Sequence, residues 1–191
     1  LAHCGKLELE DVEVKIQKRN KMPTKGLRKF LKTLSKEDLI KYIVELDKKY
    51  KLVQEHYEVY LAFDISGFVE KQKKIIVNEF FPSKGLPKVR LSVARKAISD
   101  AKKMGFPPEA LADLMLFYVE NGVQFTNEFG DIDEPFYTSM ENMYRDALKY
   151  IRSERLRDKF ENRAYLIPEK AEGTGWGFHE TLYDFYYEYF Y

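Results

Sequence analysis

The chain has 191 residues, of which 45% are hydrophobic and 33% are charged, and its formal net charge is +1. This composition excludes wholesale disorder, and the length suits one domain built around a single core. The one cysteine, Cys4, excludes an internal disulfide and a zinc site made of several cysteines. No apolar run approaches the roughly 20 residues that cross a bilayer, so we expect a cytoplasmic protein without a membrane partner.

The small net charge hides a strong division along the chain. Residues 1–103 carry 24 Lys and Arg against 14 Asp and Glu, whereas residues 104–191 carry 8 against 17. The resulting balances of +10 and −9 indicate either an anionic partner for the first half or attraction between the halves on folding.

Residues 1–21 are predicted to be an N-terminal extension, either flexible or not native to the protein. They contain no signal-peptide core, and Met22 opens a stretch with much clearer periodicity. A short strand is the alternative, because apolar residues alternate in this segment at Leu7, Leu9, Val12, Val14 and Ile16. We expect one all-helical domain over residues 22–191.

Apolar spacing after Met22 predicts about seven helices. Ser35 and Asp38 form a pattern like a capping box, and the heptad seam behind them predicts one long helix over 36–62. Further helices are predicted over 64–80, 89–104, 108–129, 134–152, a shorter segment after Ser153, and 178–191. The predicted fold class is therefore all-α, either a single irregular helical bundle or a short helical superhelix.

Prolines and glycines predict the breaks between these helices. Loops are expected at 81–87 and from Pro168 to Gly177 because proline and glycine disfavour a helix interior. Gly122 lies inside the helix predicted over 108–129, at a cost of about 1 kcal/mol relative to alanine. This cost indicates that a neighbouring helix packs closely there.

A basic segment between Lys84 and Lys103 is the first candidate site. Lys88, Arg95 and Lys102 repeat every seven residues, which predicts one basic face on a helix over 88–103. Rows of cations bind phosphate, but aromatic residues for base stacking are missing, so nucleic acid is a possible partner that we do not favour. The alternative is a solvated face, or one paired with the acidic half of the chain. The candidate anion-binding residues are Lys84, Lys88, Arg90, Arg95, Lys96 and Lys102.

An acidic turn near residue 130 is the second candidate, together with a histidine in the glycine-rich segment 173–179. Carboxylates could hold a hard cation, but capping of a helix N-terminus explains acidic residues at this place without a metal. Neither segment matches an EF-hand, a P-loop or a dinucleotide-binding pattern, so no cofactor is predicted. The candidate metal ligands are Glu128, Asp131, Asp133, Glu134 and His179.

The C-terminal segment is the third candidate, because nine of the residues 176–191 are aromatic. On a helix, one face carries Leu182, Phe185, Tyr186 and Tyr189 and can dock on the core. The remaining aromatic residues predict a surface for a protein partner or a second copy of the chain, or else tyrosines at the boundary with water. The candidate partner-surface residues are Trp176, Tyr183, Tyr187 and Tyr191.

Three stretches together resemble a known family: EFFPSKGLPKVRLSVARKAISDAKK (79–103), LADLMLFYVENGVQFTNEFGDIDEPFYTSMENMY (111–144) and GTGWGFHETLYDFYYEYF (173–190). The family is an uncharacterised bacterial domain of unknown function, and the resemblance covers most of the chain from Met22 onward. It implies a cytoplasmic bacterial protein that begins at Met22, and it implies no catalytic residue.

The leading functional hypothesis is a non-enzymatic binding or interaction module. The basic helix over 88–103 would face an anion, and the aromatic C-terminal helix would face a protein. The first alternative is a metal-assisted hydrolase that uses the acidic turn 128–134 and His179. The second alternative is a structural helical homodimer without a ligand.

Overall fold

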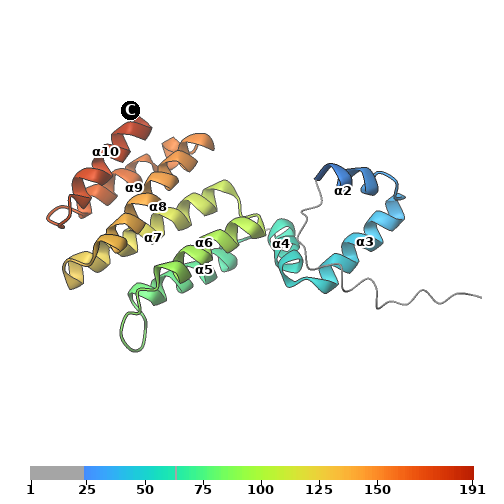
Figure 1. Cartoon of the computed structure of the whole chain (residues 1–191), viewed down its shortest axis with the longest axis horizontal. Helices are drawn as coiled ribbons and strands as arrows, with labels where there is room; N and C mark the ends of the chain where they lie inside the picture. The colour runs from blue at the N-terminus through green and yellow to red at the C-terminus, as the bar shows by residue number, and fades with distance from the viewer. Residues whose placement is uncertain (1–23, 63) are drawn as a thin grey trace, which may run out of the picture. The chain divides into compact units, whose positions relative to one another are not determined.

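The structure is a computed structural model that describes residues 24–62 and 64–191 (Figure 1). Within these residues it contains nine α-helices and no strand, which confirms the predicted all-α class. None of the described helices is long and apolar enough to span a membrane. The extension predicted at residues 1–21, and the strand considered there, lie outside the described residues.

The chain divides into two compact units at Tyr50. As far as it is described, the first unit holds α2 (Thr24–Leu31) and α3 (Lys36–Lys49). The second unit, residues 50–191, holds the other helices: α4 (Lys51–Leu61), α5 (Ser66–Phe80), α6 (Leu91–Met104), α7 (Pro108–Phe129), α8 (Glu134–Ser153), α9 (Arg157–Lys170) and α10 (Phe178–Phe190).

The prediction of one long helix over 36–62 is wrong, because the helix is interrupted in the middle of this range. Helix α3 ends at Lys49 and α4 begins at Lys51, because Tyr50 between them is extended, with φ of −124° and ψ of 112°. The apolar seam continues across Tyr50, so periodicity alone could not reveal the break. The predicted cap is present at the start of α3, where Ser35 Oγ accepts a hydrogen bond of 3.1 Å from the backbone N–H of Asp38.

The second unit is a helical bundle made of hairpins (Figure 1). Helix α5 packs against α6, α7 against α8, and α9 against α10, while α7 also contacts α5, α6 and α9. Helix α7 is therefore the centre of the bundle, and eleven of its residues are buried. The bounds predicted for this helix, 108–129, agree with the structure.

Close packing at Gly122 is confirmed. A Cβ atom added to Gly122 would lie 2.1 Å from Sδ of Met140 on α8, and Met140 is fully buried. Helices α7 and α8 therefore approach each other at a point where only a hydrogen atom fits.

Pro168 lies inside α9, whereas the sequence predicted that a loop begins there. Proline cannot donate the usual hydrogen bond to the carbonyl four residues earlier, which belongs to Ala164. The hydroxyl of the buried Tyr144 on α8 donates to this carbonyl instead, over 2.9 Å. A bond from another helix thus satisfies the acceptor that Pro168 leaves open, and α9 continues to Lys170.

Candidate functional site

The predicted basic face is present on α6, but it is shorter than the sequence indicated. The helix begins at Leu91, so Lys88 lies in the preceding loop and does not share a helix face with Arg95 and Lys102. These two residues are seven positions apart and lie on the same side of α6, next to the buried stripe of Ala94, Ala97, Ile98 and Ala101.

Three cations of this segment already have acidic partners: Arg90, Lys96 and Lys103. Arg90 binds the buried carboxylate of Glu79 with two hydrogen bonds, from Nε over 3.0 Å and from Nη2 over 2.7 Å. Lys96 forms a close ion pair with Asp100, which Lys103 also approaches at 3.4 Å. The charges of Arg90 and Lys96 are therefore already neutralised by carboxylates of the protein. The sequence had predicted that both residues bind an external anion.

The hydrogen bonds from Arg90, which outweigh the effect of burial, lower the pKa of Glu79 below its usual value. Stability that depends on this carboxylate is present above the unfolded-state pKa of about 4.3 and is lost as the pH falls through the lower folded-state pKa. We expect the Glu79→Gln variant to have a lower urea midpoint than the wild type at pH 7 and a smaller difference at pH 3. Glu172→Gln, an exposed control on the loop after α9, should follow the wild type across this range.

A groove between α6 and α8 contains two cations of α6 that form no ion pair, Arg95 and Lys102. It encloses about 560 Å³, and Arg95 and Lys102 line one side of it while Lys149 and Asp146 line the other. Neither Arg95 nor Lys102 forms an ion pair or a hydrogen bond within the described residues. The apolar part of the lining consists of Ile98, Leu111, Met115, Met143 and Tyr150.

Lys149 is a groove residue that sequence reasoning missed. Its ammonium group lies 5.5 Å from the ring centre of Tyr189, an arrangement that is favourable for a cation. Lys149 belongs to the acidic half of the chain, and only the packing of α6 and α8 against α7 places it in the same groove as Arg95 and Lys102. No local sequence signal could have identified this pairing.

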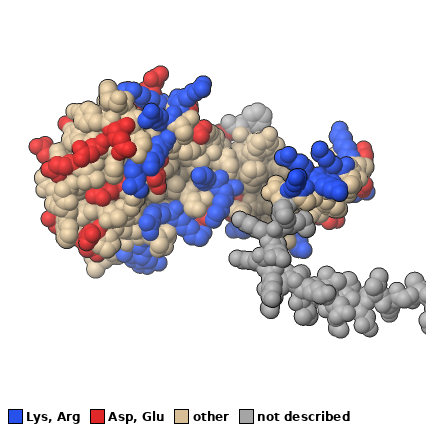
Figure 2. Space-filling model, turned by 45° about the horizontal axis from the view of Figure 1, so that its top comes forward, with Lys and Arg blue, Asp and Glu red and all other residues tan. Residues whose placement is uncertain are grey.

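The charge division survives folding of the second unit. In Figure 2 the acidic side chains gather at the left end of this unit, and the basic side chains gather nearer its middle. The ion pair between Lys73 and Asp113, at 2.9 Å, joins the basic half to the acidic half. The pairs of Arg90 and Lys96, by contrast, stay within the basic half.

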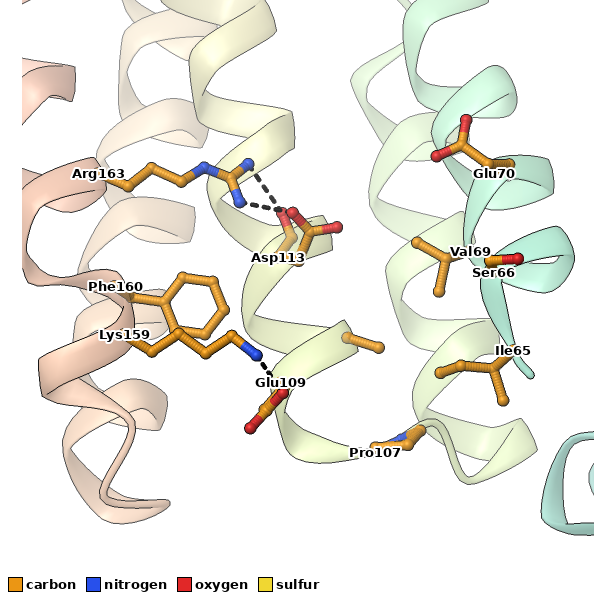
Figure 3. A pocket seen from close by; sticks show the side chains of 11 residues that line it. Ile65, Ser66, Val69, Glu70, Pro107, Glu109, Asp113, Lys159, Phe160 and Arg163 are labelled. Atoms are coloured by element: carbon orange, nitrogen blue, oxygen red, sulfur yellow. Dashed lines mark hydrogen bonds and ion pairs between the residues drawn. The ribbon is translucent and has the colours of Figure 1, made fainter. Parts of the chain in front are cut away.

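A second hollow of about 590 Å³ lies over α7, with α5 on one side and α9 on the other (Figure 3). Its charged side chains are held in ion pairs. Arg163 of α9 reaches Asp113 and also binds Glu120 through two hydrogen bonds of 2.7 Å, and Lys159 pairs with Glu109. Because the cations of this hollow are already neutralised, we regard the α6/α8 groove as the better candidate for an anionic ligand.

Burial disfavours the charge of Arg163, but the hydrogen bonds and charges of Glu120 and Asp113 outweigh it and raise the pKa of the guanidinium. Asp113 also forms an ion pair with Lys73. This network ties α5, α7 and α9 together and is best explained as a structural bridge.

Hydrogen bonds within the protein hold four of the predicted metal ligands: Glu128, Asp131, Asp133 and His179. The Asp131 carboxylate accepts hydrogen bonds from the Tyr137 hydroxyl, at 2.9 Å, and from the backbone N–H of Gly175, at 3.0 Å. Asp133 caps α8 at Phe136 N, and Glu128 accepts from Gln124. Within 24–62 and 64–191, no three His, Cys, Asp or Glu side chains come together so that they could hold a metal ion.

The acidic turn and the glycine-rich loop nevertheless meet, through Asp131 and Gly175. Glu134 lies in the first turn of α8, and Nδ1 of His179 lies 3.0 Å from the carbonyl oxygen of Pro168. These contacts hold the α7–α8 turn and the loop before α10 in place, which is a structural role.

The C-terminal helix docks as predicted, with Leu182 and Tyr186 among the buried residues of α10. Of the predicted partner surface, Tyr183 and Tyr191 donate hydrogen bonds to Glu169 and Glu161 of α9. Trp176 is 61% exposed, Tyr187 52% and Tyr191 80%. The tyrosines therefore form a partly exposed seam between α9 and α10.

Comparison with family models matches residues 22–190 to DUF6155, a family of unknown function. The chain belongs to this family. Its DUF6155 region includes all three stretches on which the sequence resemblance depends. Comparisons with curated proteins and with solved structures found no match.

Proposed function

We propose that this DUF6155 protein is a binding module whose α6/α8 groove holds an acidic segment of a partner protein. The observation that supports the proposal is the set of three cations, Arg95, Lys102 and Lys149, around an apolar groove floor. Arg95 and Lys102 form no ion pair in the described part of the chain, although other cations of α6 do. A carboxylate-bearing ligand would supply the missing charge.

The floor of the groove favours a peptide over a nucleic acid. Single-stranded bases need aromatic faces on which to stack, and the lining offers one, Tyr150. Aliphatic side chains, in contrast, fit against Ile98, Met115 and Met143, and methionine adapts its shape to different apolar partners. An amphipathic helix with leucines on one face and glutamates beside them matches both features.

The test is fluorescence anisotropy with a labelled 15-residue peptide of glutamate, leucine and alanine, designed with the leucines along one helix face. We expect Arg95→Glu combined with Lys102→Glu to weaken binding by about tenfold or more, because both contacts become repulsive. The matched control is Lys71→Glu combined with Lys74→Glu, the same charge change at exposed positions of α5. It should change the affinity by less than about twofold.

A second variant tests the groove by gain of binding. Asp146 is the acidic residue of the lining, so Asp146→Asn should tighten binding of the glutamate peptide by about two- to threefold. A gain cannot result from damaged folding.

The proposal is wrong if the control pair weakens binding as much as the groove pair, or if Asp146→Asn has no effect. It is also wrong if a labelled 15-nucleotide single strand binds more tightly than the peptide and responds to the same groove variants. In that case the groove would serve nucleic acid.

A further inference from the structure

The first unit exposes apolar surface that its two helices cannot cover. None of the residues of α2 and α3 is buried. Helices of this length are marginally stable in water unless tertiary packing covers an apolar face. The exposed large apolar side chains are Leu27, Phe30, Ile40, Tyr42, Ile43 and Val44.

Helix α2 covers only one side of α3. Leu27 and Leu31 of α2 line a shared hollow with Leu39, and the ring of Phe30 lies 6.2 Å from that of Tyr42. At 100° per residue, Ile40 and Val44 lie on α3 beyond the side that meets α2. Ile40 is 53% exposed and Val44 43%, so α2 leaves this second apolar side uncovered.

The exposed side of α3 has opposite charges at its two ends. Glu37, Ile40, Val44 and Lys48 are spaced by three, four and four residues, so they form one row along the helix. The acid stands in the first turn of α3 and the lysine in the last. Neither has an ion-pair partner among the described residues.

This row is complementary to itself when reversed. We propose that two copies of the chain associate through α3, with the two helices antiparallel about a twofold axis. Ile40 and Val44 of the copies then pack together in the middle, and each Glu37 lies opposite Lys48 of the other copy. A twofold axis makes such a contact isologous and closed, and the two hairpins form a four-helix arrangement.

The apolar area of this contact is small. Ile40 and Val44 are the large apolar side chains of the row, and they are 53% and 43% exposed. At roughly 150 Å² for each full side chain, two copies bury about 300 Å² of apolar surface, so the dimer is a weak one. The cations Lys25 and Lys29 lie on the side of α2 opposite Leu27 by helical geometry, so they stay outside this contact.

Charge exchange tests the antiparallel arrangement. In sedimentation velocity on the full chain at low salt, Glu37→Lys alone and Lys48→Glu alone should each raise the dimer dissociation constant by about tenfold. An equimolar mixture of these two variants should form a heterodimer at the same concentration at which the wild type dimerises, because every facing pair is then opposite in charge. The double variant Glu37→Lys with Lys48→Glu should also recover the wild-type dimer.

The apolar contact is tested by Ile40→Glu, which should abolish the dimer, against Leu86→Glu, which should not. Leu86 is 85% exposed in the α5–α6 loop. A variant could lose the dimer simply because its hairpin unfolds. Hydrogen exchange on the wild type avoids this ambiguity, because it needs no substitution. Protection of α2 and α3 should fall on dilution, whereas protection of α7 and α8 should not.

A wild-type chain that stays monomeric at all concentrations overturns the proposal, whether or not its hairpin is protected. So does a dimer that withstands Ile40→Glu, or two single charge variants that fail to associate on mixing. A monomer whose hairpin becomes protected only with vesicles containing phosphatidylserine would assign this surface to lipid instead.

Discussion

The Arg163→Met variant is expected to lose about 2–4 kcal/mol of unfolding free energy, because it leaves two carboxylates without their partner in a half-buried place. Arg163 is 29% exposed, and its guanidinium binds Glu120 through Nε and Nη2 and Asp113 through Nη1. After the substitution Asp113 keeps Lys73, but Glu120 keeps no ion pair. Urea unfolding followed by far-UV circular dichroism at pH 7 measures the loss.

The matched control is Lys159→Met on the same helix. Lys159 pairs with Glu109, but both side chains are more than half exposed, so we expect a loss below about 1 kcal/mol. Adding Glu120→Gln to Arg163→Met should recover part of the loss, because the amide needs no counter-charge. If Arg163→Met and Lys159→Met destabilise the protein equally, the network among α5, α7 and α9 does not have the role assigned to it.

Gly122→Ala is expected to destabilise the protein by about 1–3 kcal/mol, although alanine is the better helix former. The added methyl group would overlap Sδ of Met140, and the side chain of Met140 is fully buried, so it must displace its neighbours to move away. In an uncrowded helix the same change from glycine to alanine raises the free energy of unfolding by up to about 1 kcal/mol. The sign of the effect therefore distinguishes close packing from propensity.

Gly67→Ala provides that comparison in one chain. Gly67 lies in α5, and a Cβ added there meets nothing within 4 Å, so this variant should be as stable as the wild type or more stable. Thermal unfolding of both variants measures the sign of the stability change that each substitution causes. Combining Gly122→Ala with Met140→Ala should cost less than the sum of the single changes; simple additivity would mean that the two residues do not interfere.

The sequence predicted much of the fold because helix signals are local. The bounds of α7, the cap at Ser35 and the close approach at Gly122 all follow from patterns within one helix. The break at Tyr50 was missed, since the apolar seam runs through it and the extended backbone of one residue leaves no periodic signal.

The candidate site was predictable only in part. Arg95 and Lys102 were chosen correctly as neighbours on one helix face, because seven residues make two turns. Sequence could not show that Glu79 neutralises Arg90, nor that Lys149 completes the groove, because each of these partners lies on another helix. The predicted metal ligands do not assemble for the same reason, since Glu128, Asp131, Asp133 and His179 each have a hydrogen-bond partner elsewhere.

The sequence by itself determined the all-α class, most helix positions and the division of charge along the chain, since all of these depend on residue types and their spacing. Tertiary structure alone decided which cations remain without a partner, because an ion pair depends on the distance between side chains from different helices. It also decided that α9 continues through Pro168, where the hydroxyl of Tyr144 takes the place of the missing backbone donor.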